Sequence, residues 1–175
     1  GQIQDAADPE NYANVNISGV TPEYLDYMKL EMYAGRNLTD ADNKGQKKVC
    51  LIADTMASRY FGDKDPIGET VSVTSTDGSI DDFVVVGIYV YNQALFGQVD
   101  TSIPEKDRTT QLLIPLQTCF KLQGSDQTGY DYFNLLLTPL ADVEQATADA
   151  LAYFEQIYAN NKNFTVSAYN MASSM

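Results

Sequence analysis

Residues 19–36 read GVTPEYLDYMKLEMYAGR, and they contain the signals for a change from strand to helix. The residues just before them, Val15–Ser18, predict a strand that ends at Gly19. A helix is expected to begin at Thr21, because a hydroxyl cap, the following proline and the acidic Glu23 all favour a helix start. This helix is predicted to end near Lys29 and to bury Tyr24, Leu25 and Met28.

The chain that follows predicts a polar loop and then a strand–helix pair. The loop is expected over residues 34–48, and an apolar strand over 48–53. A helix is predicted over 55–61, because Asp54 is a suitable N-cap and Gly62 suits a left-handed cap at the helix end.

A hairpin is the next predicted feature. Residues 65–68, DPIG, are typical of a turn. Strands over 69–76 and 80–90 are then expected to pair around Asp77-Gly78, a dipeptide that favours a two-residue hairpin turn.

Residues 91–108 show little periodicity and predict a long loop or irregular excursion of the kind that is usually functional or mobile. A strand over 111–114 should follow, and Pro115 should open a short helix that ends at Gly124. The last predicted elements are a strand, an amphipathic helix capped by Asp142 and another strand, over residues 132–138, 142–158 and 164–168. This order predicts a βαβ unit with parallel strands and a right-handed crossover.

Charge and hydropathy exclude several classes of protein. The chain has 11 Lys and Arg against 24 Asp and Glu, a net charge of −13, so neither nucleic acid nor an anionic membrane surface is an expected partner. No run approaches the ~20 apolar residues that a membrane helix needs. Cys50 and Cys119 fit no metal-ligand spacing, and we expect two buried free thiols, with a disulfide as the alternative.

The sequence lacks the residues of common catalytic sites. Histidine is absent, which removes the usual general base and most zinc sites, and no phosphate-binding glycine loop is present. Residues 40–45 and 63–68 begin like calcium loops, but Lys44 and Ile67 occupy ligand positions. We therefore predict no catalytic residue, cofactor or metal, and solvated turns in place of calcium sites.

A series of motifs in order resembles one family. Residues 19–25 and 30–36 are similar to the GVTPEYF and LLAGR signature of the MacB-like periplasmic core domain, found in ABC-transporter permeases of the MacB/FtsX type. Residues 49–71 resemble the segment of the family that ends in DPIGKTI, residues 83–88 its F.VVGV strand, and residues 113–116 its V.VPLST motif. The residues that carry the resemblance are Gly19, Pro22, Tyr24, Gly35, Arg36, Phe61, Gly62, Pro66, Gly68, Gly87 and Pro115.

The resemblance implies an α+β fold with two lobes. A βαβ-containing, porter-like lobe would comprise residues 1–33 and 108–175, and a smaller mixed α/β, sabre-like lobe would be inserted as residues 34–107. Because the family has a further helix and strand before the strand that ends at Gly19, the first lobe is expected to be incomplete at its N-terminus.

The resemblance also implies a function outside the cytoplasm. The chain would be a non-catalytic domain at the extracytoplasmic face of the bacterial plasma membrane, anchored by membrane helices outside residues 1–175. It would couple ATP-driven movement to export of a peptide, drug or lipoprotein, or to an extracellular partner. Its partners in the parent protein would be an ATPase domain and a second permease copy.

Tyr91, Leu95 and Phe96, in the irregular excursion, are the candidate contacts with a partner or substrate. The alternative for Leu95 and Phe96 is that they pack onto the domain. Two other functions stay open at this point: a stand-alone extracellular module that binds a peptide or glycan, and a hydrolase that uses two carboxylates.

Overall fold

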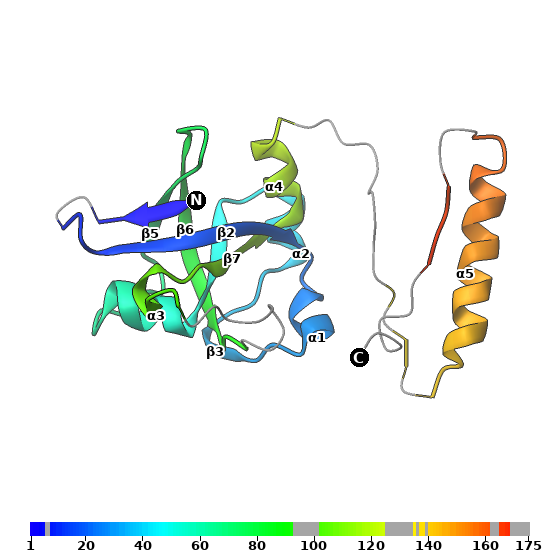
Figure 1. Cartoon of the computed structure of the whole chain (residues 1–175), viewed down its shortest axis with the longest axis horizontal. Coiled ribbons are helices and arrows are strands. Elements are labelled where there is room, and N and C mark those ends of the chain that lie inside the picture. The colour runs from blue at the N-terminus through cyan, green and yellow to red at the C-terminus, as the bar shows by residue number, and fades with distance from the viewer. Residues whose placement is uncertain are drawn as a thin grey trace. The chain divides into compact units, whose positions relative to one another are not determined.

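The computed structural model describes residues 1–5, 8–92, 102–124, 135, 137–138, 140–161 and 165–168. The chain divides into two compact units, Gly1–Gly129 and Tyr130–Met175, and each is described by itself. The first unit holds the sheet and the short helices, and the second holds the longest helix (Figure 1). The fold combines one mixed sheet with helices, which agrees in outline with the expected α+β class.

The sheet of the first unit has seven strands in the order β3-β6-β4-β7-β2-β1-β5. An additional pairing between β5 and β6 closes this order into a ring, and β3 lies outside the ring against β6. The strands are β1 (Gln2–Gln4), β2 (Tyr12–Val20), β3 (Met32–Gly35), β4 (Val49–Ala53), β5 (Thr70–Thr74), β6 (Ile80–Tyr89) and β7 (Thr110–Pro115).

The ring contains two parallel pairs among antiparallel ones. β2 is parallel to β7, and β4 is parallel to β6, whereas β4 and β7 are antiparallel. Side chains alternate between the interior and solvent, because successive residues of a strand point to opposite faces. In β6, for example, Phe83 and Val85 are buried while Ile80 and Val84 are exposed. The interior is filled by apolar side chains, the largest being Tyr89, Phe83, Ile3, Leu51, Ile52, Met56, Leu112, Leu113 and Ile114.

Short helices follow the strands. They are α1 (Tyr24–Met28), α2 (Asp40–Lys44), α3 (Asp54–Phe61), α4 (Leu116–Leu122) and the 3-10 turn η2 (Glu105–Asp107) in the first unit, with α5 (Val143–Tyr158) in the second. The predicted helices after β4 and β7 and the long helix capped by Asp142 are confirmed, and the Asp142 carboxylate accepts a hydrogen bond from the N–H of Gln145.

Four local predictions are wrong in detail. Asp54 is the first residue of α3 and not its N-cap, which is Ala53 and forms no side-chain hydrogen bond. Helix α1 begins at Tyr24 and has no side-chain cap. The Thr21 hydroxyl instead donates a hydrogen bond to the Glu23 carboxylate. The hairpin of β5 and β6 is confirmed, but residues 75–79 connect the strands, with Ser75 N donating to Ser79 O, so the turn is longer than two residues. Residues 34–48 are not a loop, because they contain the end of β3 and the capped helix α2.

The predicted βαβ unit is not formed in the described part of the second unit. Residues 135, 137–138 and 165–168 are outside any strand, and the remaining residues of the two predicted strands are outside the described residues. Helix α5 is present, but none of its residues is buried. A parallel pair of strands has no independent stability, so a helix signal between two apolar runs is not sufficient for a βαβ unit.

The sheet joins strands from both lobes that the sequence analysis distinguished, and the lobe boundaries stay a prediction. None of the described helices combines the length and the hydropathy required to cross a membrane.

Candidate functional site

The signature glycine Gly19 lies where β2 meets α4. A Cβ on Gly19 would overlap the Cβ of Cys119 and lie 3.0 Å from its Sγ, so only glycine permits this contact between strand and helix. Val20 is paired with Pro115 at the end of the parallel strands, and Pro115 is the residue from which α4 begins. Gly19 and Pro115 thus set the position of α4 on the sheet.

Gly35 and Gly87 form a second close contact, opposite each other in the β3–β6 register. A Cβ on Gly35 would overlap the carbonyl oxygen of Val86, and the φ of Gly35 is 74°. A Cβ on Gly87 would overlap the carbonyl oxygen of Arg36. The two glycines therefore let the backbones of β3 and β6 approach more closely than side chains would allow.

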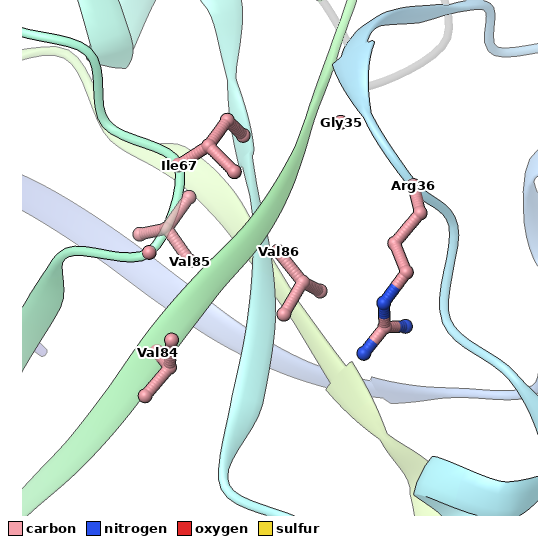
Figure 2. A pocket seen from close by; sticks show the side chains of 7 residues that line it. Gly35, Arg36, Ile67, Val84, Val85 and Val86 are labelled. Carbon is pink, nitrogen blue, oxygen red and sulfur yellow. The ribbon is translucent and has the colours of Figure 1, made fainter.

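An open, shallow groove of about 290 Å³ lies beside this contact. Figure 2 shows its walls: valines of β6 and Ile67 on one side, and the Gly35–Arg36 backbone on the other. The lining residues are Gly35, Arg36, Ile67, Gly68, Val84, Val85 and Val86. Such walls offer van der Waals contact to an apolar side chain, but not the convergent polar groups that position a small molecule.

The turn before β5 forms one edge of the groove. Gly68 has a φ of 88°, and its N–H donates to the carbonyl oxygen of Val85 at 2.8 Å. The N–H of Glu69 donates to the carbonyl oxygen of Pro66 at 3.1 Å, which closes the predicted turn. The structure thus brings Gly35, Arg36 and Gly68 together at the groove.

A buried carboxylate lies behind Arg36. Asp42 is 1% exposed, and its two oxygens accept hydrogen bonds from Arg36 Nη1 at 2.7 Å and Lys47 Nζ at 3.1 Å. The N–H and the hydroxyl of Thr39 also donate to Asp42, at 3.0 and 2.7 Å. Burial alone would raise the pKa of Asp42, but hydrogen bonds from Arg36, Thr39 and Lys47 outweigh burial and hold this pKa well below its usual range.

This ion cluster replaces one of the two calcium-like loops. Residues 40–44 form helix α2, and Thr39 and Asp42 cap its start reciprocally. In the other loop the Asp65 carboxylate accepts a hydrogen bond from the N–H of Ile67. The role of Asp42 was not predicted, although the spacing of Thr39 and Asp42 is the capping-box signal of a helix start.

The irregular excursion is hydrogen-bonded at one end to the first residue of α3 and at the other end to β2. The N–H of Tyr91 donates to Asp54 Oδ1 at 2.9 Å, and the same oxygen accepts the N–H of Thr55 at the start of α3. At the other end Asp107 accepts the hydroxyl of Tyr12 through its carboxylate, and the side-chain amide of Asn14 through its carbonyl at 3.0 Å. Tyr91 is half-buried, whereas the other two candidate contacts, Leu95 and Phe96, lie outside the described residues.

The remaining signature residues support packing. Tyr24 and Phe61 are half-buried against the core, and the Phe61 ring packs edge-on against Tyr60 with centroids 5.0 Å apart. Gly62 ends α3 with a φ of 59°. The carbonyl oxygen of Pro22 accepts a hydrogen bond from the Asn37 side chain at 2.9 Å.

The ionisable groups show no pattern of acid–base catalysis among the described residues. The carboxyls with a shifted pKa are Glu23, Asp42 and Asp77, and in each case hydrogen bonds lower the pKa. A general acid needs a raised pKa, so these groups give the two-carboxylate hydrolase no support. The described residues contain no group of three metal-ligating side chains.

Cys50 and Cys119 are free thiols, as predicted. Cys50 is buried as expected, but Cys119, which packs against Gly19, is only half-buried. Burial raises the pKa of both thiols, so both react slowly at neutral pH.

Comparison with known proteins gives a family match over most of the chain. The model of the family described as MacB-like periplasmic core domain matches residues 2–153. A curated relative is the macrolide export ATP-binding/permease protein MacB of Bdellovibrio bacteriovorus, 23% identical over 163 residues. The alignment covers 91% of this chain and 23% of that relative.

Two solved structures have a similar fold. The periplasmic region of MacB from Actinobacillus actinomycetemcomitans superposes with a TM-score of 0.58 and 18% identity, over 83% of this chain and 57% of that one. The extracellular domain of the noncanonic ABC-type transporter YknZ from Gram-positive bacteria superposes with a TM-score of 0.54 and 18% identity. That superposition covers 86% of this chain and 68% of the other.

Proposed function

The chain belongs to the family of MacB-like periplasmic core domains, and on this premise we propose that it transmits ATP-driven movement of a permease to a cargo or partner outside the cytoplasm. As a family member it is an extracytoplasmic domain of an ABC-transporter permease. The proposed coupling role makes it a non-catalytic part of the transporter. ATP would be hydrolysed by an ATPase domain elsewhere in the parent protein, and a second permease copy would complete the assembly.

The observation that carries the proposal is the role of the signature residues. Gly19, Gly35 and Gly87 permit close backbone contacts, and Arg36 neutralises a buried carboxylate. These contacts stiffen a closed sheet and supply no reactive group. A stiff body of this kind suits a domain that transmits movement, because it is displaced as a whole instead of deforming.

The excursion at residues 91–108 is the proposed contact region, with Tyr91, Leu95 and Phe96 as its contact residues. The hydrogen bonds of Tyr91 and Asp107 support this, because a loop held at both ends by a rigid scaffold is a common carrier of recognition residues. A macrolide, a peptide and a lipoprotein are the cargo classes that this proposal allows. The stand-alone binding module is not favoured by any observation, since both solved neighbours are transporter domains.

Photo-crosslinking in cells tests the proposal. A benzoylphenylalanine placed at Phe96 of the parent transporter should form an adduct whose yield differs between an active and a hydrolysis-deficient ATPase. The matched control is the same probe at Tyr33, which is 70% exposed and lies on β3, and it should give no ATP-dependent adduct. Equal adduct yields at Phe96 with both forms of the ATPase would contradict the proposal.

A further inference from the structure

Residues 36–47, which we call the strap, contact two segments that are far apart in the sequence, one just before α1 and one at the start of α4. At one end the side-chain amide of Asn37 donates to the carbonyl oxygen of Pro22, just before α1, at 2.9 Å. Near the other end Asn43 Oδ1 accepts the N–H of Gln117, in the first turn of α4, at 2.9 Å. The strap therefore joins the backbone before α1 to the start of α4.

A second hydrogen bond strengthens the contact with α4. The hydroxyl of Thr118 donates to the carbonyl oxygen of Lys47 at 2.9 Å, and Thr118 is 1% exposed. Because a buried hydroxyl has little access to water, breaking this hydrogen bond would leave it without a partner and would cost free energy. The first turn of α4 is thus held by Asn43, within α2, and by Lys47, after it.

The strap is also closed on itself. Asp42 pairs with Arg36, the first residue of the strap, and with Lys47, the last. The side chain of Asp42 is 1% exposed, whereas those of Arg36 and Lys47 are 47% and 53% exposed. A buried carboxylate with two cationic partners keeps the two ends of the strap at a fixed separation, so a displacement of one end is passed to the other.

We propose that the strap is a conformational coupler: it makes the stability of α1 depend on the position of α4, and the stability of α4 depend on the position of α1. The helices α1 and α4 follow β2 and β7, the parallel neighbours of the sheet, and the strap adds a polar connection between them beyond the sheet. The biological role of this coupling rests on the proposed transmission of movement, but the coupling itself is a property of this chain alone.

Amide hydrogen exchange on the 175-residue chain tests the coupler without ATP or a transporter. The N–H of Leu30 reports on α1, since it donates to Leu25 O at 2.9 Å, and the N–H of Gln123 reports on α4, since it donates to Cys119 O at 3.1 Å. Asn43→Ala removes a contact of α4 only, yet it should raise the exchange rate of Leu30 about 2- to 30-fold. In the Asp42→Asn background the same substitution should leave the exchange rate of Leu30 unchanged.

Reciprocity and a matched control make the test strict. Asn37→Ala removes the contact before α1 and, within the strap, the acceptor of the Leu38 N–H at 2.7 Å. It should raise the exchange rate of Gln123, because coupling acts in both directions. Leu122→Ala shortens a side chain of α4 that packs against the core and takes no part in the hydrogen bonds between α4 and the strap. It should raise the exchange rate of Gln123 but not that of Leu30. If Asn43→Ala does not fold, Thr118→Val removes the other bond to α4 and takes its place.

Two results would overturn the coupler. One is an Asn43→Ala variant in which the exchange rate of Gln123 rises while that of Leu30 does not change, which would show that the strap holds α4 alone. The other is an equal rise in the exchange rate of every amide, including those of β4 and β7, which would show a global loss of stability. Failure of the transport proposal would leave these exchange rates unaffected, so the two failures are distinguishable.

Discussion

The strap and helix α5 differ in the strength of their sequence signals and in the depth of their burial. The strap reads as a polar loop, yet Leu38 is 3% exposed and Asp42 is 1% exposed. Helix α5 has apolar residues at helical spacing along its length, yet none of its residues is buried. Apolar periodicity therefore identifies a helix but does not show what the helix packs against. A capping residue and a charged side chain, by contrast, can belong to a segment that is buried in the interior.

The largest expected effect concerns the glycine just before the strap. Gly35→Ala should lower the free energy of unfolding by about 4 kcal/mol, because it adds a Cβ at positive φ and against the backbone of Val86. Gly78 is the matched control, with a φ of 84° and open space around the added Cβ. Gly78→Ala should lower the free energy of unfolding by about 1 kcal/mol. Urea unfolding measures both, and equal losses would show that close backbone contact is not what Gly35 provides.

The next effect concerns the buried carboxylate of the strap. Asp42→Asn should lower the free energy of unfolding at pH 7 by about 2 kcal/mol, because the amide is a weaker partner for Arg36 and Lys47. The pKa of Asp42 is lowered in the folded chain, so its contribution is complete above the ordinary Asp pKa of about 4 and decreases as the pH falls below it. Urea unfolding between pH 7 and pH 3 should therefore show a smaller pH dependence in Asp42→Asn.

An exposed ion pair supplies the control for that prediction. Lys48 and Asp81 are 2.9 Å apart, and their side chains are 51% and 19% exposed. Lys48→Gln should change the free energy of unfolding by less than about 1 kcal/mol, because solvent screens such pairs. A loss as large as that of Asp42→Asn would contradict the importance given to burial.

A smaller effect is expected at the start of α5. Asp142→Ala removes the carboxylate that accepts the N–H of Gln145 at 3.0 Å, and it should destabilise α5 by about 1 kcal/mol. Hydrogen exchange of the Ala146 amide, which donates to the carbonyl oxygen of Asp142, measures this loss. Exchange at Leu30 should not change, and a change there would show that α5 and the first unit unfold together.

The smallest effect is expected on the apolar side of α5. Phe154→Ala should change the free energy of unfolding by about 0.5 kcal/mol, because Phe154 packs edge-on against Tyr153 but is not buried. Ile114→Ala, at a buried position of the sheet, should lower the free energy of unfolding by about 3 kcal/mol. Similar losses for the two variants in urea unfolding would show that α5 is packed as tightly as the sheet.

Local chemistry made several elements predictable. The β5–β6 hairpin followed from alternation and from Asp77-Gly78, and α3, α4 and α5 followed from Asp54, Pro115 and Asp142 at their starts. The closure of the sheet between β1 and β5 did not follow, because it depends on pairing between residues about 70 positions apart.

The site was predictable in part. Gly35, Arg36 and Gly68 were identified as signature residues, and the structure brings them to one groove. Asn43 was not identified, because its importance depends on Gln117, which belongs to α4. Asp42 was not identified either, although its partners Arg36, Thr39 and Lys47 are near it in the sequence. A single sequence shows a polar residue but not the partner that makes it structural.

The proposed function includes a second permease copy, and the distance between two copies of this domain in such a transporter tests the proposed transmission of movement most directly. Thr76→Cys, at the exposed tip of the β5–β6 hairpin, can carry a spin label in the parent transporter, since burial makes Cys50 and Cys119 slow to react. If the domain transmits ATP-driven movement, the distance between the two labels should differ between the nucleotide-free and the ATP-bound states. The same distance distribution in both states would contradict the proposed function.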